Sequence, residues 1–458
     1  MSAIILSAIW GVVMMFSGIF LKSGSAIRTT AIVGLLILLI ANIGELYGFH
    51  PLSFNSRNMI VVTSFGLIFN TIIFASTLIY MLLSGKDIEA VSSSTSDHLA
   101  LIFFVLCGAS IASSYNTLLM LFIGIEIISI PLYILTGSDK KNLHSNEASL
   151  KYFLMGSFST GLMLMGIALI YGARGSFGID NMSQSLTPGM MPLLVAGLLL
   201  LIISMSFKVS AAPFHFWTPD VYDGAPTVFT AFMATIVKVA AFVAFLHLFD
   251  GAYGQMPGKW NLVMSIITAS TLFIGNITAV FQQSVKRMLA YSSIAQAGFM
   301  CFALFGLNEF AKEGLLLYSA AYCLATIGIF AILVRMKDYT FEGFNGLGKS
   351  EPMVAAMNTI FLLSLAGIPL TAGFTAKFYM LAAAVKNGSY LWLVIFAVIC
   401  AAISVYYYFR VIQAMYFKEG GKQTIVVSSG FKLGLAVIAA LLIVLGIFPQ
   451  LLFTKMYF

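Results

Sequence analysis

The chain has 458 residues, of which 60% are hydrophobic and only 9% are Asp, Glu, Lys or Arg. About 25% of the residues in a soluble domain are charged, so this chain has too few charges to cover a water-exposed surface. We therefore expect a membrane protein, whose apolar side chains face lipid and whose backbone groups pair within helices. The net charge of +7 comes from basic residues scattered singly or in pairs between apolar runs, which does not indicate nucleic-acid binding.

The cysteines give no sign of a metal or redox centre. All four lie within apolar runs and none has C-x-x-C spacing: Cys107, Cys301, Cys323 and Cys400. This pattern argues against a disulfide framework, a zinc site and an iron–sulfur cluster, and we interpret the residues as buried small hydrophobic side chains. The sequence also has no dinucleotide fingerprint, P-loop or nucleophile elbow. Any redox reaction is therefore expected in partner subunits.

Apolar runs of about 20 residues are long enough to cross a hydrocarbon core of about 30 Å. Fourteen such runs follow one another, at 2–21, 28–48, 58–84, 97–112, 115–136, 148–172, 190–213, 225–249, 260–281, 288–306, 312–336, 352–383, 390–418 and 431–454. The first run lacks the basic start of a signal peptide, because its first cation, Lys22, follows the run. The narrowest separation is at Tyr115–Asn116, and merging the two runs there would reverse the side of every later loop.

The distribution of basic residues predicts the orientation. With fourteen spans and an outer N-terminus, the inner loops hold 14 cations: Lys22, Arg28, Lys86, Lys140, Lys141, Lys151, Lys286, Arg287, Arg335, Lys337, Lys349, Lys418, Lys422 and Lys432. The outer side holds 6: Arg57, Arg174, Lys259, Lys312, Lys386 and Lys455. This asymmetry agrees with the positive-inside rule and predicts that both termini lie outside.

Two runs share an unusual pattern that indicates an internal repeat. The seventh carries Lys208 and Pro213, and the twelfth carries Pro369 and Lys377. The twelfth run comes five runs after the seventh, so two five-helix units would face opposite ways, as inverted repeats with broken helices do in transporters. We expect residues 1–96 to form a three-helix segment, 97–250 and 260–418 the two units, and 431–458 a C-terminal helix. The polar stretches 84–98 and 337–351 are predicted to be connecting loops.

Four charged residues lie deep within apolar runs: Glu126, Lys208, Lys238 and Lys377. A charge at mid-membrane costs roughly 2.5–3.5 kcal/mol on insertion scales, so such residues usually line an ion pathway. The alternatives are a structural hydrogen bond between helices for the glutamate and snorkelling for the lysines. Lys238 is roughly 20 Å into a run that starts at Ala225, which is too deep for easy snorkelling.

The proline after Lys208 strengthens the case for that lysine. Pro213 removes one backbone donor, so carbonyls near Val209 are expected to lose their partners and to form a polar pocket. Burial disfavours the charged ammonium, whereas a nearby carboxylate favours it. A lysine between these two influences can load and release a proton.

Five further residues are weaker candidates. His215 is an interfacial anchor or part of a path, and His247 extends a proton path or only ends a helix. Arg410 is close enough to the inner end of its span to snorkel. Lys286 and Gln296, both in VKRMLAYSSIAQAGF (285–299), are secondary candidates.

Four segments resemble the antiporter-like, proton-translocating membrane subunits of respiratory complex I, the NADH:quinone oxidoreductase. They are GIEIISIPLYILTG (124–137), FKVSAAPFHFWTPDVYDGAPTVFTAF (207–232), VKRMLAYSSIAQAGF (285–299) and SLAGIPLTAGFTAKFYML (364–381). With the spans around them they cover residues 95 to 420, and their order and spacing match as well. Within this family the chain looks like the N-type subunits, because of Lys238, because it ends soon after the last span, and because Lys377 is not a glutamate.

The resemblance implies an all-α polytopic fold of about fourteen helices, with two inverted five-helix repeats broken at Pro213 and Pro369. It implies that protons pass along Glu126, Lys208 and two further lysines, Lys238 and Lys377, coupled to quinone reduction elsewhere. The implied partners are related antiporter-like subunits in the inner (plasma) membrane of the cell. Flavin, iron–sulfur clusters and quinone are implied in other subunits, and no cofactor or metal on this chain.

The sequence departs from the family pattern at two positions. Gln296 replaces the usual histidine of the AYSSIAH segment, and Val228 replaces the usual proline after GAPT. Three other functions remain open: a cation/proton antiporter subunit of the Mrp type, a membrane subunit of a related hydrogenase or dehydrogenase, and a purely structural scaffold.

Overall fold

The computed structural model describes residues 1–49, 52, 54–91, 94–179, 189–253, 260–386, 390–419, 425 and 427–453. Within these residues every element is a helix, and only isolated β-bridges connect loops. The predicted all-α fold is confirmed.

The described residues of the first half form ten α-helices and two π-helical segments. They are α1 (Ser2–Phe20), α2 (Gly24–Leu46), α3 (Ser64–Val91), α4 (Thr95–Ala112), α5 (Leu118–Thr136), α6 (Leu143–Arg174), α7 (Met191–Lys208), α8 (Trp217–Gly224), α9 (Thr227–Phe232), η1 (Met233–Val237), α10 (Lys238–Leu248) and η2 (Phe249–Tyr253). The second half contains α11 (Asn261–Val280), α12 (Val285–Met300), α13 (Ala303–Gly306), α14 (Glu309–Leu333), η3 (Glu342–Phe344), α15 (Leu347–Ser350), α16 (Pro352–Ala366), α17 (Ala372–Lys386), α18 (Leu391–Phe417), α19 (Ser429–Ile447) and α20 (Gln450–Phe453).

Each of the fourteen predicted runs coincides with one helix or with a chain of consecutive helices. Twelve of the described helices are long and apolar enough to cross a membrane by themselves. The other two runs are α12, with 16 residues, and the pair α16 and α17, with 15 residues each. The narrow separation at Tyr115–Asn116 is confirmed, because α4 ends at Ala112 and α5 begins at Leu118.

The loop predicted at 84–98 is wrong, because α3 continues to Val91 and α4 already begins at Thr95. Asp87 lies 3.5 Å from Arg335 in an ion pair, so the helix continues past its apolar residues with its charge compensated. The loop predicted at 337–351 contains the short helices η3 and α15. Three of the cations counted above, Lys259, Lys422 and Lys455, lie outside the described residues.

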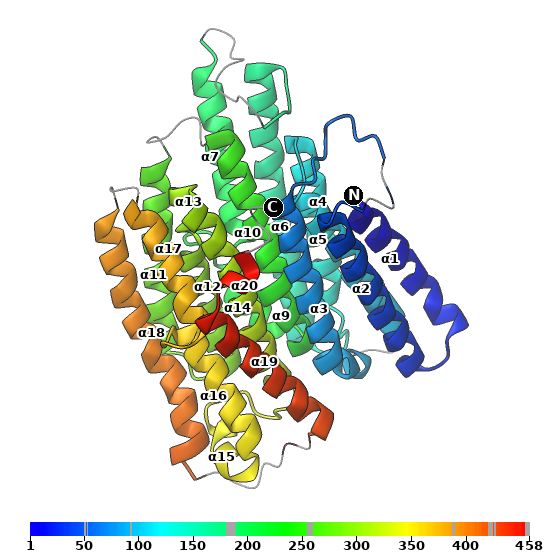
Figure 1. Cartoon of the computed structure of the whole chain (residues 1–458), viewed down its shortest axis with the longest axis vertical. Coiled ribbons are helices and arrows are strands. Elements are labelled where there is room, and N and C mark those ends of the chain that lie inside the picture. Colours follow the sequence, from blue (N-terminus) through cyan, green and yellow to red (C-terminus); the bar gives the residue numbers. More distant parts are fainter. Residues whose placement is uncertain are drawn as a thin grey trace.

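The helices lie side by side, with α1 at one edge and α18 at the opposite edge (Figure 1). The C-terminal α19 crosses the other helices at a slant (Figure 1). The apolar 18-residue windows of the stretch Thr227–Tyr253, from α9 to η2, and of α14 are completely buried, whereas only 28% and 33% of the corresponding windows of α1 and α2 are buried. The exposed faces of the outer helices carry large apolar side chains such as Phe20, Phe158 and Ile395, as expected of surfaces that meet lipid.

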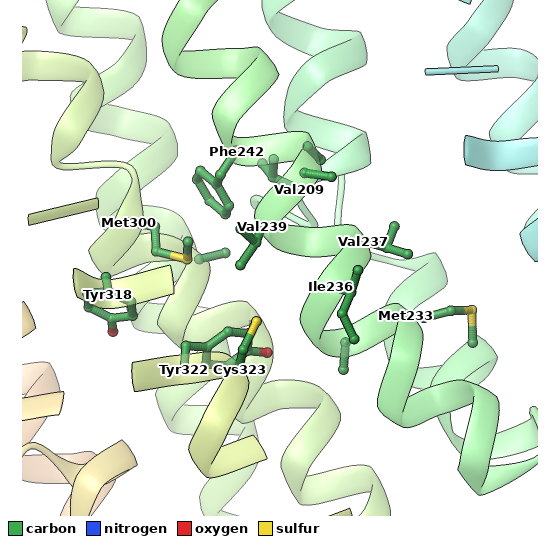
Figure 2. Close-up of a cluster of buried hydrophobic side chains, with 14 of the residues drawn as sticks. Val209, Met233, Ile236, Val237, Val239, Phe242, Met300, Tyr318, Tyr322 and Cys323 are labelled. Atoms are coloured by element: carbon green, nitrogen blue, oxygen red, sulfur yellow. The ribbon is translucent and has the colours of Figure 1, made fainter. Parts of the chain in front are cut away.

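The two buried stretches pack against each other at the centre of the molecule (Figure 2). Ile236 and Phe242 of the eighth run are fully buried beside Met300 of α12 and the tyrosines Tyr318 and Tyr322 of α14. The cysteines are also buried, as predicted. This centre therefore combines apolar packing with two phenol groups, and a buried phenol generally needs a hydrogen-bond partner.

The seventh and twelfth runs are broken where the prolines predicted. The helix α7 ends at Lys208, Ser210 has a φ of +64°, and α8 begins only at Trp217. In the twelfth run, Gly367 has a φ of +83°, a left-handed conformation that favours glycine, and α17 begins at Ala372. Both breaks bring helix ends, with their free backbone groups, close to a lysine.

Candidate functional site

Glu126 of α5 and Lys208 at the end of α7 form an ion pair. The Lys208 Nζ lies 3.7 Å from the Glu126 Oε1 and donates a hydrogen bond of 2.8 Å to the Ser129 hydroxyl. The Thr160 hydroxyl of α6 donates to the same carboxylate oxygen at 2.7 Å. The side chains of the pair are only 8% and 20% exposed. Three helices, α5, α6 and α7, therefore hold one carboxylate and one amine together.

Backbone carbonyls at the break after Lys208 accept more hydrogen bonds than the presence of Pro213 led us to expect. The Ser206 carbonyl accepts from the backbone N–H of Ala211 at 2.8 Å. The Phe207 carbonyl accepts from the indole of Trp217 at 3.0 Å. These two carbonyls have thus lost their usual helical hydrogen bonds but accept other hydrogen bonds instead. The expectation that carbonyls near Val209 remain without a donor is therefore wrong for Ser206 and Phe207.

Lys238 lies at the first position of α10, directly after the π-helical η1. It is 2% exposed, and its Nζ donates to the Ser293 carbonyl at 2.8 Å and to the Ser293 hydroxyl at 3.0 Å. Single π-helical turns are rare and occur frequently at functional sites. Ser293 belongs to α12, so Lys238 connects the helices of the first predicted unit to those of the second.

Lys377 of α17 extends back to the end of α16. Its Nζ donates to the carbonyls of Leu365 and Ala366 at 2.8 and 3.0 Å, and lies 4.6 Å from the centre of the Phe299 ring. A cation is stabilised at a helix C-terminus, where the carbonyls are free. A Cβ added to Gly367 would lie 2.9 Å from the Lys377 Cδ, so the glycine leaves room for this side chain.

Gln296 is the centre of a buried polar cluster beside Lys377. Its amide Nε2 donates to the Leu365 carbonyl at 2.9 Å and to the Tyr408 hydroxyl at 3.0 Å, while its Oε1 accepts from the Tyr318 hydroxyl. Gln296 and Lys377 therefore share the Leu365 carbonyl. A small cavity of about 10 Å³ adjoins both side chains, which is close to the space that one water molecule needs.

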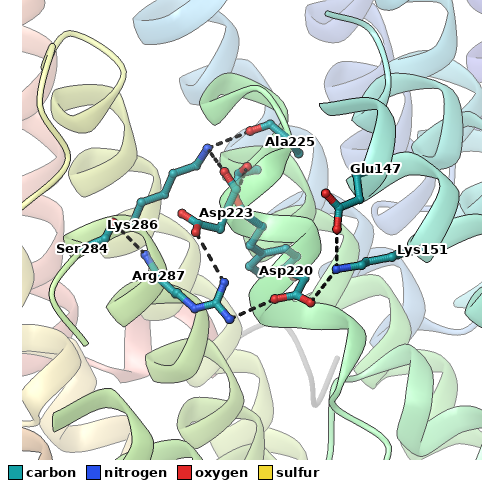
Figure 3. A network of polar contacts seen from close by, with 10 residues as sticks. Glu147, Lys151, Asp220, Asp223, Ala225, Ser284, Lys286 and Arg287 are labelled. Carbon is teal, nitrogen blue, oxygen red and sulfur yellow. Dashed lines mark hydrogen bonds and ion pairs between the residues drawn. The ribbon is translucent and has the colours of Figure 1, made fainter. Parts of the chain in front are cut away.

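Lys286 is buried at the start of α12, where its Nζ donates to the carbonyls of Asp223 and Ala225 at 2.8 and 2.7 Å (Figure 3). Its neighbour Arg287 forms ion pairs with Asp223 at 3.4 Å and with Asp220 at 2.9 Å. Asp220 in turn contacts Lys151 of α6 at 3.0 Å (Figure 3). These charges line a cavity of about 690 Å³. All of them lie on the side predicted to be inner.

The three remaining candidates, His215, His247 and Arg410, lie in other parts of the described structure. His215 lies in the break between α7 and α8 and stacks on Phe216 at 4.9 Å. The ring of His247 lies 4.6 Å from that of Tyr115. Arg410 donates to the carbonyl of Val280, the last residue of α11, at 2.9 Å. We interpret Arg410 as a cap of that helix.

The sequence did not single out the hydroxyl groups that contact the charged residues. They are Ser129, Thr160, Ser293, Tyr318 and Tyr408. One available signal was the Ser-Ser pair directly before the segment with Gln296. Another was the position of Tyr318 and Tyr322, four residues apart on an otherwise apolar run, which places them on one helix face.

Fold and site together define a class of protein. Buried charged residues at two interrupted membrane helices, in corresponding places of the chain, are typical of secondary transporters and of ion-translocating subunits related to them. The family described as NADH:quinone oxidoreductase/Mrp antiporter, TM matches residues 115–404.

Curated relatives narrow this class. The NADH-quinone oxidoreductase subunit N of Cytophaga hutchinsonii is 42% identical over 99% of this chain and 98% of its own. The subunit N of Flavobacterium psychrophilum is 38% identical over 98% and 99%. The chain belongs to the NADH-quinone oxidoreductase subunit N family, and the resemblance drawn from its motifs is confirmed.

Solved structures agree with the fold. A chain of respiratory complex I from Thermus thermophilus with bound aureothin is 30% identical, with a TM-score of 0.84 over 98% of both chains. A chain of the Mrp complex from Dietzia also has a TM-score of 0.84, over 99% of this chain and 96% of its own. At 16% identity this second likeness shows the fold alone.

Proposed function

We propose that the chain is a proton-translocating membrane-arm subunit of a NADH:quinone oxidoreductase, which moves protons along Glu126, Lys208, Lys238 and Lys377. The observation that carries this proposal is the succession of buried amines, each of which contacts a carboxylate, hydroxyl or carbonyl oxygen on another helix segment. A scaffold would not need three amines at this depth, where each is costly.

In the first unit, Glu126 stabilises the protonated form of Lys208, since opposite charges a few ångströms apart attract strongly in a medium of low dielectric. The Ser129 and Thr160 hydroxyls hold the two groups in place. A change of charge nearby alters how strongly this pair holds a proton. We therefore assign the Glu126–Lys208 pair as the site where the chain first binds the proton.

Lys238 receives the proton between the two units. Its hydrogen-bond partners are the neutral hydroxyl and carbonyl of Ser293. Among the described residues no carboxylate lies within ion-pair distance of its Nζ. Burial without a carboxylate partner disfavours the charged form of an amine, which favours transfer of the proton from Lys238 to the next group.

From Ser293 the path continues along one face of α12 to Gln296, which lies three residues further on. The amide of Gln296 does not ionise, so the tyrosine hydroxyls and a water in the adjacent cavity carry the proton past it. Gln296 holds the hydroxyls of Tyr318 and Tyr408 in place. The proton then reaches Lys377 at the Leu365 carbonyl.

The proposal extends to orientation, organisation and partners. Both termini lie on the outer side of the plasma membrane, and the cavity beside Asp220 opens on the inner side. Residues 97–250 and 260–418 act as two inverted translocation units between the segments 1–96 and 431–458. Flavin, iron–sulfur clusters and quinone belong to other subunits, no redox centre lies on this chain, and related antiporter-like subunits are its neighbours.

Energy reaches this chain as an electrostatic change, because a charge shift at one buried group alters the proton affinity of the next. The test uses the purified complex in proteoliposomes with Lys208→Met, and measures protons moved per NADH oxidised. We expect a lower ratio with the subunit composition intact, whereas Lys418→Met, an exposed lysine on the same predicted side, should leave the ratio unchanged.

A wild-type ratio in Lys208→Met would refute the proposed path. The purification itself tests the assignment to the complex. Flavin and iron–sulfur signals that copurify with the chain support a redox-driven complex. A colourless preparation with a few membrane proteins would indicate a cation/proton antiporter of the Mrp type instead.

A further inference from the structure

A groove of about 610 Å³ runs between α2, α3 and α19, and its lining includes none of the four charged residues of the proposed path. One end of the groove is basic, with Arg28, Lys86 and Arg335 among the residues that line it. Its wall is aliphatic and includes Leu82 of α3 and Val437 of α19. Among the described residues no Asp or Glu lines the groove itself, although Glu89 and Asp87 pair with its two arginines.

The polarity of the groove follows from the directions of its helices. On α2 the lining runs from Arg28 to Ile32, and on α3 it runs from Lys86 back to Ile79. The second of these intervals spans about 10 Å along a helix axis. The basic end therefore lies at the predicted inner surface, and the aliphatic wall extends from there toward the middle of the membrane.

The cations at the basic end differ in how far they are neutralised. Arg28 pairs with Glu89 at 2.5 Å, and Arg335 pairs with Asp87 at 3.5 Å and stacks over the Phe431 ring at 3.8 Å. Lys86 is exposed and has no ion-pair partner among the described residues. One positive charge at the mouth of the groove thus remains free for a ligand.

The aliphatic wall is open to the surroundings of the chain. The side chains of Leu82, Leu433 and Val437 are 63%, 64% and 51% exposed. Gly434 permits the close approach of α19 to α3, because a Cβ there would lie 2.7 Å from the Leu83 Cδ2. Together α3 and α19 therefore form an aliphatic wall of the groove that is exposed on the surface of the chain.

We propose that this groove binds an anionic phospholipid, with its phosphate at Lys86 and Arg28 and one acyl chain along Leu82, Leu433 and Val437. Basic pockets between membrane helices on the cytoplasmic side bind acidic lipid headgroups. The charges favour an anionic headgroup over a zwitterionic one, and the aliphatic wall favours a lipid over a free phosphate ion. The bound lipid ties the C-terminal α19 to the N-terminal helices.

The test uses the whole complex in mild detergent and a phosphatidylglycerol with a photoreactive group midway along one acyl chain. After illumination, mass spectrometry locates the crosslinked peptides. We expect labelling of the peptides with Leu82 and Leu433, and competition by unlabelled phosphatidylglycerol but not by phosphatidylcholine. Lys86→Gln should reduce labelling about fivefold, since one cation near the surface contributes about a factor of five to the binding of an acidic lipid.

The matched control is Lys418→Gln, another exposed lysine on the predicted inner side that does not line the groove. It should leave labelling unchanged. Equal competition by phosphatidylcholine, or by inorganic phosphate alone, would overturn the proposal. So would labelling confined to another subunit, because that result would mean that a protein partner covers the groove.

Discussion

Replacing Gln296 by leucine tests whether the cluster around it carries protons. Leucine has a similar volume but makes none of the hydrogen bonds of the amide. In the native chain these bonds involve the Leu365 carbonyl and the hydroxyls of Tyr408 and Tyr318. We expect the variant complex to oxidise NADH but to move fewer protons per NADH.

The cost in stability can be worked out from the partners that remain. The Leu365 carbonyl still accepts from Lys377 at 2.8 Å, and the Tyr408 hydroxyl still has Ser292 at 2.5 Å. Only the Tyr318 hydroxyl loses its one described partner. An unmade hydrogen bond of a buried group costs about 1–3 kcal/mol, so the subunit should still fold and assemble.

The assay compares Gln296→Leu with Gln296→His and Gln283→Leu in proteoliposomes. The histidine can donate and accept protons, so it should restore the ratio of protons to NADH. Gln283 lies between α11 and α12 and is exposed, so its replacement should have no effect. A wild-type ratio in Gln296→Leu would refute the role of this cluster.

Three further variants test other parts of the structure. Gly367→Ala should lower the melting temperature of the complex and reduce pumping, because φ is +83° and the new Cβ would press on Lys377; unchanged values of both would contradict the packing described. Glu126→Gln keeps an acceptor for Thr160 but removes the charge beside Lys208, so we expect pumping to fall and thermal stability to drop, because a buried amine loses its partner; wild-type pumping in the assembled complex would contradict the role of the pair. Asp220→Asn weakens ion pairs whose side chains are 33% to 42% exposed, so we expect a loss below about 1 kcal/mol that shrinks in high salt; a much larger loss measured by thermal unfolding would contradict that picture.

The fold could be predicted from sequence because its main signals are local. Apolar length fixes a membrane helix almost independently of its neighbours, and Pro213 and Pro369 marked the two breaks. The end of α3 was misjudged because its charged last turns are stabilised from a distance, by the contact of Asp87 with Arg335. Such a partner, 248 positions away in the chain, has no local signal.

The four deep charges could be found from sequence because a charge in an apolar run is rare and costly. Their partners could not. Ser293 is one of many serines, and only the packing of α10 on α12 gives its hydroxyl a role beside Lys238. The same holds for Tyr408, which meets Gln296 across two helices distant in sequence. The charges could thus be predicted, but the hydroxyls between them required the structure.

The most direct test of the central claim is the Lys238→Met variant, because this residue joins the two predicted units and is almost completely buried. The measurement is the number of protons moved per NADH oxidised by the purified complex in sealed proteoliposomes, with electron transfer measured separately in the presence of an uncoupler. We expect uncoupled electron transfer to persist and the ratio to fall. An unchanged ratio in a fully assembled complex would contradict the proposed path through this chain.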